Sequence, residues 1–157
     1  MPQQFFDLYS LDDIVLPKVR EDDLDDLPAE GLKFARARRS DFEKIRKADR
    51  WKQAVRAYLA SNSYADHQIG HVLEALYRSA YAKNTIIVFW SDHGWHLGEK
   101  QHWHKTTLWE EATRVPLIIS APAFVSNAVA SLRRIPGCMK STWASAYATK
   151  RPRLPER

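Results

Sequence analysis

The chain has 157 residues, 45% of them apolar, with 24 lysines and arginines against 19 aspartates and glutamates for a formal net charge of +5. These values suit one domain with a buried core and exclude a wholly disordered chain, while the single cysteine excludes an intrachain disulfide framework and a zinc site made only of thiolates. No apolar run approaches the roughly 18 residues that span a bilayer, and the Met-Pro-Gln-Gln start lacks the pattern of a secretory signal.

Residues 2–32 combine scattered apolar side chains with an acidic run at residues 21–26. Pro17 and Pro28 also lie in this segment, and prolines and clustered acids both disfavour regular structure. We therefore expect an extended connection whose acidic run is a solvated loop.

Apolar residues recur at spacings of three and four over residues 41–82, which predicts a long helix. Asp41 or Asp49 is a candidate for its first residue. Residues 61–63 are poor helix formers, so a bend or break is expected there.

Two short apolar, β-branched runs follow, at residues 84–91 and 115–120. Their length suits strands buried on both faces, as in a parallel sheet. A loop and a short helical stretch at residues 108–113 separate them. This order of elements predicts an α/β fold with parallel-type strands flanked by helices.

Residues 123–157 lack a convincing period and are expected to be a poorly ordered tail. The last 31 residues carry seven basic groups and one acid, so the excess positive charge of the chain lies here. A basic tail leaves open a nucleic-acid-binding protein, which predicts salt-dependent binding that is lost on deleting residues 127–157.

The densest polar cluster follows the first expected strand, where ligands of open α/β sheets bind. Gly94 in this loop allows a tight backbone turn or a close approach to a ligand. Three interpretations are open for this segment. The first is a hard-cation site built on Asp92, with Lys105 directed at an anion. The second is purely structural packing. The third is zinc bound by four histidines, namely His93, His96, His102 and His104.

The spacing of residues 84–118 carries a family resemblance. The series Ser-Asp-His-Gly-Trp, Leu-Gly-Glu, Lys and Thr-Arg-Val-Pro resembles the type I sulfatases, and more narrowly their iduronate-2-sulfatase-like branch within the alkaline-phosphatase-like superfamily. The resemblance extends to the Phe-Asp-Leu-Tyr stretch at residues 6–9 and to residues 57–66. It implies a partial sulfatase catalytic domain over residues 1–122 that lacks its N-terminal part, followed by an unmatched tail.

The resemblance also implies roles for four residues. Asp92 and His93 match the second half of the family's divalent-metal site, usually calcium. Lys105 matches the lysine that contacts the sulfate, and Trp95 matches an aromatic residue beside the substrate pocket. The implied reaction is hydrolysis of a sulfate ester on a small molecule or sugar, in which a formylglycine hydrate attacks sulfur. No membrane or nucleic-acid partner is implied.

The family's formylglycine arises in a Cys-x-Pro-Ser-Arg-type motif, which this sequence lacks. Cys138, the single cysteine, has neither the proline nor the arginine of that motif. We therefore expect a fragment that is inactive alone and whose partner is a missing N-terminal half. Two alternatives are a non-catalytic metal- or anion-binding remnant and a phosphoester or phosphonate hydrolase fragment of the same superfamily.

Overall fold

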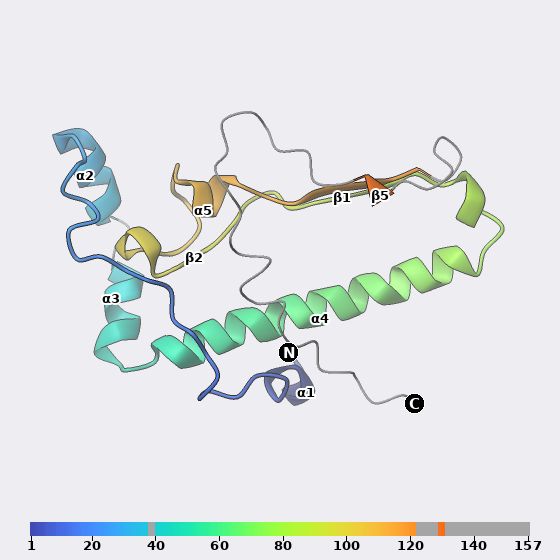
Figure 1. Cartoon of the computed structure of the whole chain (residues 1–157), viewed down its shortest axis with the longest axis horizontal. Helices are drawn as coiled ribbons and strands as arrows, with labels where there is room; N and C mark the ends of the chain where they lie inside the picture. The colour runs from blue at the N-terminus through green and yellow to red at the C-terminus, as the bar shows by residue number, and fades with distance from the viewer. Residues whose placement is uncertain (38–39, 122–128, 131–157) are drawn as a thin grey trace.

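A computed structural model describes residues 1–37, 40–121 and 129–130 (Figure 1). The tail expected at residues 123–157 lies outside the described residues except for 129–130, and Cys138 lies outside them too. Within the described part, no helix has both the length and the apolar character needed to cross a membrane.

The expected long helix is divided in two, because the chain turns at Asp49. The helices preceding the sheet are α1 (Gln3–Phe6), α2 (Ala29–Ala37), α3 (Ser40–Lys47) and α4 (Trp51–Tyr77). Asp49 has a φ of 52°, and the amide groups of Asp49 and Arg50 donate to carbonyls of Arg46 and Ile45 at 3.0 Å. This pattern closes the end of α3 and is tolerated by aspartate in the left-handed region. The break expected at residues 61–63 was wrong, since α4 continues through them.

The segment before α3 is more ordered than expected. Helix α1 packs on α4, where Arg56 donates two hydrogen bonds to the Phe6 carbonyl at 3.0 and 2.9 Å. The side chain of Phe5 is buried beneath this contact. Pro28 precedes α2, and its carbonyl accepts the Leu32 amide at 2.9 Å. Proline is tolerated at a helix start, so its presence marked the beginning of a helix rather than an extended connection.

The two apolar runs form strands β1 (Ile87–Trp90) and β4 (Leu117–Ser120), but they pair antiparallel, with Trp90 opposite Leu117. The parallel arrangement expected from the sequence is therefore wrong for this pair. A parallel pair needs a crossover, usually a helix of a dozen residues. Here the connection holds only short elements, so the chain returns at the same end of β1. These elements are β2 (His96–Leu97), η2 (Glu99–Gln101), β3 (Trp103–His104) and α5 (Glu110–Thr113).

A third short strand, β5 (Val129–Ala130), pairs antiparallel with β4 and gives the order β1-β4-β5. Helices combined with small antiparallel sheets are consistent with an α/β sulfatase fragment. The strands were expected to be buried on both faces, yet Trp90 is 62% exposed and Leu117 is 47% exposed. Their neighbours Val88, Phe89, Ile118 and Ile119 are exposed as well. These apolar faces are what a larger sheet with covering helices would bury.

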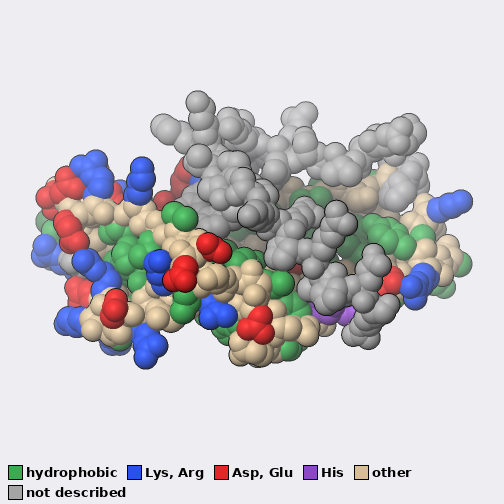
Figure 2. Space-filling view, turned by 60° about the horizontal axis from the view of Figure 1, so that its bottom comes forward, with side chains coloured by type: hydrophobic (Ala, Val, Ile, Leu, Met, Phe, Trp, Pro, Cys, Tyr) green, Lys and Arg blue, Asp and Glu red, His purple; other side chains and the backbone are tan. Residues whose placement is uncertain are grey.

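The packed core lies elsewhere, between α4 and the β2–β3 hairpin. Val55 on α4 is fully buried against Ile14 and Leu97, and aromatic side chains of Trp51 and Trp95 surround them. Figure 2 shows charged side chains crowded over the end of the molecule that carries α2 and α3. The core therefore fixes the loop after β1 on α4, which is where the candidate site is found.

Candidate functional site

Gly94 seats the loop after β1 directly on helix α5. Its amide donates to the Ala112 carbonyl at 2.8 Å, and a Cβ on Gly94 would lie 2.0 Å from the Glu111 carbonyl oxygen. No side chain fits in that space, so only glycine allows this contact. The sequence suggested a tight turn or a close approach to a ligand, and the structure shows instead a close approach to the backbone of α5. It fixes the position of the two residues that precede Gly94.

Those two residues are Asp92 and His93. The Asp92 Oδ2 and His93 Nε2 atoms lie 3.7 Å apart. His93 Nδ1 is 2.8 Å from the Gly94 carbonyl oxygen, which can only accept a hydrogen bond. The proton of a neutral His93 therefore sits on Nδ1, and the Nε2 lone pair is available beside the carboxylate.

This donor pair fits part of a metal site. A carboxylate oxygen and an imidazole nitrogen are both metal ligands, and two donors 3.7 Å apart are close enough to share one cation. The Asp92 side chain is 82% exposed, so its second oxygen is open to solvent. Among residues 1–37, 40–121 and 129–130, no group of three or more His, Cys, Asp or Glu side chains could hold a metal. The two side chains therefore offer two donors to a cation, and the described residues bring no third one to them.

Trp95 links this pair to the next segment of the loop. Its ring lies 6.2 Å from the His93 ring, 5.9 Å from the His104 ring and 6.0 Å from Tyr58, on which it stacks. Tyr58 belongs to α4, so the indole is held against the core. The Trp95 ring thus lies between the ring of His93 and the ring of His104, which precedes Lys105.

Lys105 is exposed and lies between two residues with left-handed backbones, His104 at φ 59° and Thr106 at φ 85°. Such conformations are costly and cluster at functional sites. They persist here because His104 Nε2 is 3.0 Å from Asp41 Oδ2 on α3, while His104 Nδ1 is 3.1 Å from the Lys105 carbonyl oxygen. The hydrogen bond to His104, followed by that to Lys44, lowers the pKa of Asp41.

The structure joins Asp92, His93 and Trp95 through these direct ring and polar contacts, and it connects Lys105 to them through His104. Sequence reasoning missed Asp41 and Tyr58 as supports of the site. No local pattern could have revealed them, because Asp41 reaches His104 across 63 residues of chain.

The other two histidines of this loop, His96 and His102, are packed. His96 is fully buried, with its ring nitrogens 3.1 Å from the Glu99 carbonyl oxygen and 2.7 Å from the Thr107 hydroxyl. Burial lowers the pKa of His96 to about 4. The ring of His102, which is 1% exposed, lies 5.3 Å from that of His96. The zinc interpretation has no support in the described part of the chain, where these rings pack on each other.

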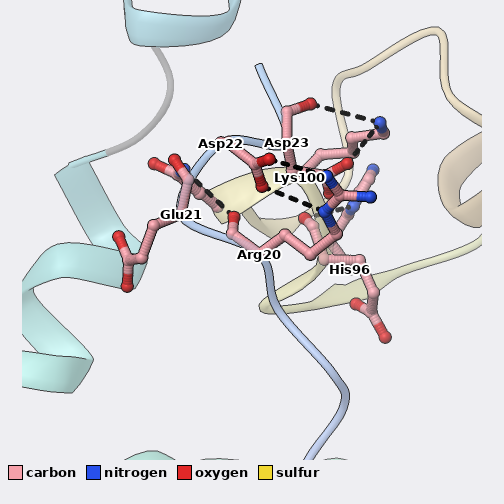
Figure 3. Close-up of polar contacts among 8 residues, drawn as sticks. Arg20, Glu21, Asp22, Asp23, His96 and Lys100 are labelled. Atoms are coloured by element: carbon pink, nitrogen blue, oxygen red, sulfur yellow. Dashed lines mark hydrogen bonds and ion pairs between the residues drawn. The ribbon is translucent and has the colours of Figure 1, made fainter. Parts of the chain in front are cut away.

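The acidic run is a turn whose acids are mostly exposed, as expected, but Asp23 and Leu24 also anchor it to the loop after β1. Figure 3 shows Asp23 pointing at Lys100, whose Nζ lies 2.8 Å from the carboxylate Oδ1. Gln101 Nε2 donates to the Glu21 carbonyl at 2.7 Å, and Leu24 is buried. The run therefore docks on the turn that precedes Lys105. Its apolar Leu24 was the one signal in the sequence for this contact.

Comparisons with known proteins agree with the motif in this loop. The family described as Sulfatase matches residues 21–131. The chain is 45% identical over 128 residues to "Sulfatase" of Formosa agariphila, which covers 78% of this chain and 24% of that protein. It is 54% identical over 66 residues to mouse Iduronate 2-sulfatase, covering 42% of this chain and 12% of that protein. It is 41% identical over 71 residues to Choline-sulfatase of Rhizobium meliloti, covering 45% of this chain and 14% of that protein. The chain thus spans a quarter or less of the length of these relatives.

Proposed function

The chain belongs to the sulfatase family, and from this premise we propose that it carries one part of a sulfate-ester hydrolase site. In this proposal Asp92 and His93 hold a divalent cation, calcium by family resemblance, and Lys105 binds the sulfate group. Residues 1–122 form part of the catalytic domain.

The observation that carries the proposal is the contact between His93 Nδ1 and the Gly94 carbonyl oxygen at 2.8 Å. Because Nδ1 donates to the Gly94 carbonyl, Nε2 faces the Asp92 carboxylate with its lone pair available. In the buried His96, by contrast, both ring nitrogens are engaged, by the Glu99 carbonyl and the Thr107 hydroxyl. An imidazole held in one tautomer beside an open carboxylate is typical of a metal ligand.

The chemistry requires positive charge around a sulfate that develops negative charge as its ester bond breaks. A bound divalent cation supplies part of that charge. Lys105 supplies the rest through its exposed ammonium group. The backbone carbonyl of Lys105 contacts His104, which in turn contacts Asp41. Trp95 limits the space on one side and orients the leaving group.

We propose a sulfated small molecule or sugar as the substrate class. The support is the names of similar proteins, Iduronate 2-sulfatase and Choline-sulfatase. Trp95 offers a flat apolar surface, and such surfaces suit the faces of sugar rings as well as a quaternary ammonium group.

The 157-residue polypeptide alone is proposed to lack turnover. It contains no Cys-x-Pro-Ser-Arg motif, and the only metal donors proposed are the two from Asp92 and His93. The exposed apolar faces of β1 and β4 support a larger sheet to which an N-terminal half contributes.

Thermal unfolding with calcium chloride and sodium sulfate tests the half-site. Calcium should raise the unfolding temperature of the wild type, and Asp92→Asn should remove that increase because the amide carries no charge. Asp12→Asn changes an exposed acid outside the site and serves as the matched control. An equal calcium effect in wild type and Asp92→Asn contradicts the proposed metal site. Measurable aryl-sulfate turnover by the pure chain contradicts its proposed inactivity.

A further inference from the structure

Two histidines outside the loop lie together on the long helix. His67 and His71 are four residues apart on α4, so their side chains project from the same face. Their Nε2 atoms are 3.0 Å apart, and the two rings are 4.5 Å apart between centroids at an angle of 77°. One ring donates and the other accepts, so the two Nε2 atoms face each other.

We propose that His67 and His71 form a bidentate site for a nitrogen-preferring divalent transition ion such as Zn²⁺, Ni²⁺ or Cu²⁺. Imidazole suits these ions, whereas calcium prefers oxygen. The site therefore differs in chemistry from the Asp92–His93 pair, and it goes beyond the proposed sulfatase function. The ion would bind both Nε2 atoms in place of the hydrogen bond that now joins the two rings.

The separation of the nitrogens already matches the geometry of a chelate. Two nitrogens bound at about 2.05 Å lie about 2.9 Å apart at a right angle and about 3.3 Å apart at the tetrahedral angle. The observed 3.0 Å between the Nε2 atoms of His67 and His71 falls inside this interval. Binding keeps the spacing of the two residues on α4, but the ring that donates through Nε2 must move that proton to Nδ1, and the rings must turn so that both Nε2 lone pairs face the ion.

Packing also holds one of the ligands in place. The His67 ring lies 5.5 Å from the ring of Phe5, which is 2% exposed and makes an edge contact with Tyr64 at 5.2 Å. Helix α1 thus limits the rotamers of His67 before any metal arrives. His71 is exposed, so solvent can fill the remaining coordination positions.

The site is open. Glu74 lies three residues beyond His71, but its carboxylate is paired with Arg78. In the described part of the chain no third His, Cys, Asp or Glu completes the group. Closed structural zinc sites have four protein ligands. An open pair should bind reversibly and exchange its ion, joining two successive turns of α4 while it is occupied.

A register-shifted variant of the full chain provides the matched test. His71→Ala with Val72→His keeps two histidines on α4 but places them five residues apart, on different faces. Val72 is 70% exposed and tolerates the change. Isothermal titration with Zn²⁺ should give a dissociation constant at least tenfold higher for this variant and for His67→Ala than for the wild type. Equal affinity in all three overturns the proposal.

A measurement on the wild type keeps the proposal testable even where a variant fails to fold. Sub-stoichiometric Ni²⁺ broadens the NMR signals of ligand rings. The ring signals of His67 and His71 should disappear before those of His93 and His104. Earlier loss of the His93 and His104 signals, or no selective loss at any histidine, overturns the proposal.

Discussion

Acid should destabilise this chain through one buried side chain, His96. Burial lowers the pKa of His96 from 6.5 to about 4. Between these values the unfolded chain binds a proton that the folded chain rejects, so stability is fully present above pH 6.5 and is lost as the pH falls toward 4. Since one pKa unit corresponds to about 1.4 kcal/mol, the loss attributable to His96 is about 3 kcal/mol by pH 4.

Urea unfolding followed from pH 7.5 to pH 4 measures this loss. His96→Gln removes the titrating group but keeps an amide that can hydrogen-bond to the Glu99 carbonyl and the Thr107 hydroxyl. Its free energy of unfolding should depend on pH less steeply than that of the wild type. Burial raises the pKa of Glu99, so Glu99 stabilises the folded chain at low pH and loses that contribution as the pH rises. This opposite pH dependence is present in both proteins, so the difference between their profiles reports His96. Identical pH profiles for wild type and His96→Gln refute the reasoning.

Three further changes test the supports of the site by urea unfolding. Gly94→Ala should lower the free energy of unfolding by about 2–3 kcal/mol, because the added Cβ would lie 2.0 Å from a carbonyl oxygen. Gly70→Ala is the control: no atom lies within 4 Å of its added Cβ, so it should stabilise α4 by about 0.5–1 kcal/mol. A Gly94→Ala protein as stable as wild type contradicts the seating on α5. Lys100→Met should cost about 1–2 kcal/mol by breaking the part-buried pair with Asp23, and much less in an Asp23→Asn background. Trp51→Phe should cost about 1 kcal/mol through loss of a 2.6 Å hydrogen bond to a backbone carbonyl, and an unchanged stability refutes that contribution.

Local sequence signals predicted the elements better than their arrangement. The runs at residues 84–91 and 115–120 are strands, and residues 108–113 contain a short helix. The direction of pairing was wrong because a run that is apolar at every position fits any sheet that is covered on both faces. Only the connection between the strands decides, and its hairpin of two-residue strands has no strong periodic signal.

The helix break at Asp49 illustrates a similar limit. Its Schellman-type closure depends on one aspartate in the left-handed region, a position usually taken by glycine or asparagine. The serines at residues 61 and 63 looked more disruptive. In the structure, the Ser61 hydroxyl donates to the Ala57 carbonyl and the Ser63 hydroxyl pairs with Tyr9, so both are accommodated within α4.

The site was partly readable because its candidate residues lie within one short motif. Asp92, His93, Trp95 and Lys105 all lie within a span of 14 consecutive positions of the sequence. Their supports come from distant segments, with Asp41 and Tyr58 contributed by α3 and α4. Polar contacts across 60 or more residues leave no pattern in a single sequence, whereas the His67–His71 pair is readable there as a spacing of four within a predicted helix.

If the loop after β1 supplies functional residues of a sulfatase site, it should work in the same place in a complete sulfatase. A chimaera provides that test. Residues 84–118 would replace the corresponding segment of the Rhizobium meliloti Choline-sulfatase, and sulfate release from choline sulfate would be measured. The chimaera should be active, and Asp92→Asn and Lys105→Ala should each lower its kcat/KM by at least about 100-fold, as expected for loss of transition-state charge stabilisation. Lys100→Met, in the same loop, should have little effect. A folded chimaera that is inactive, or one that tolerates both site substitutions, contradicts the account.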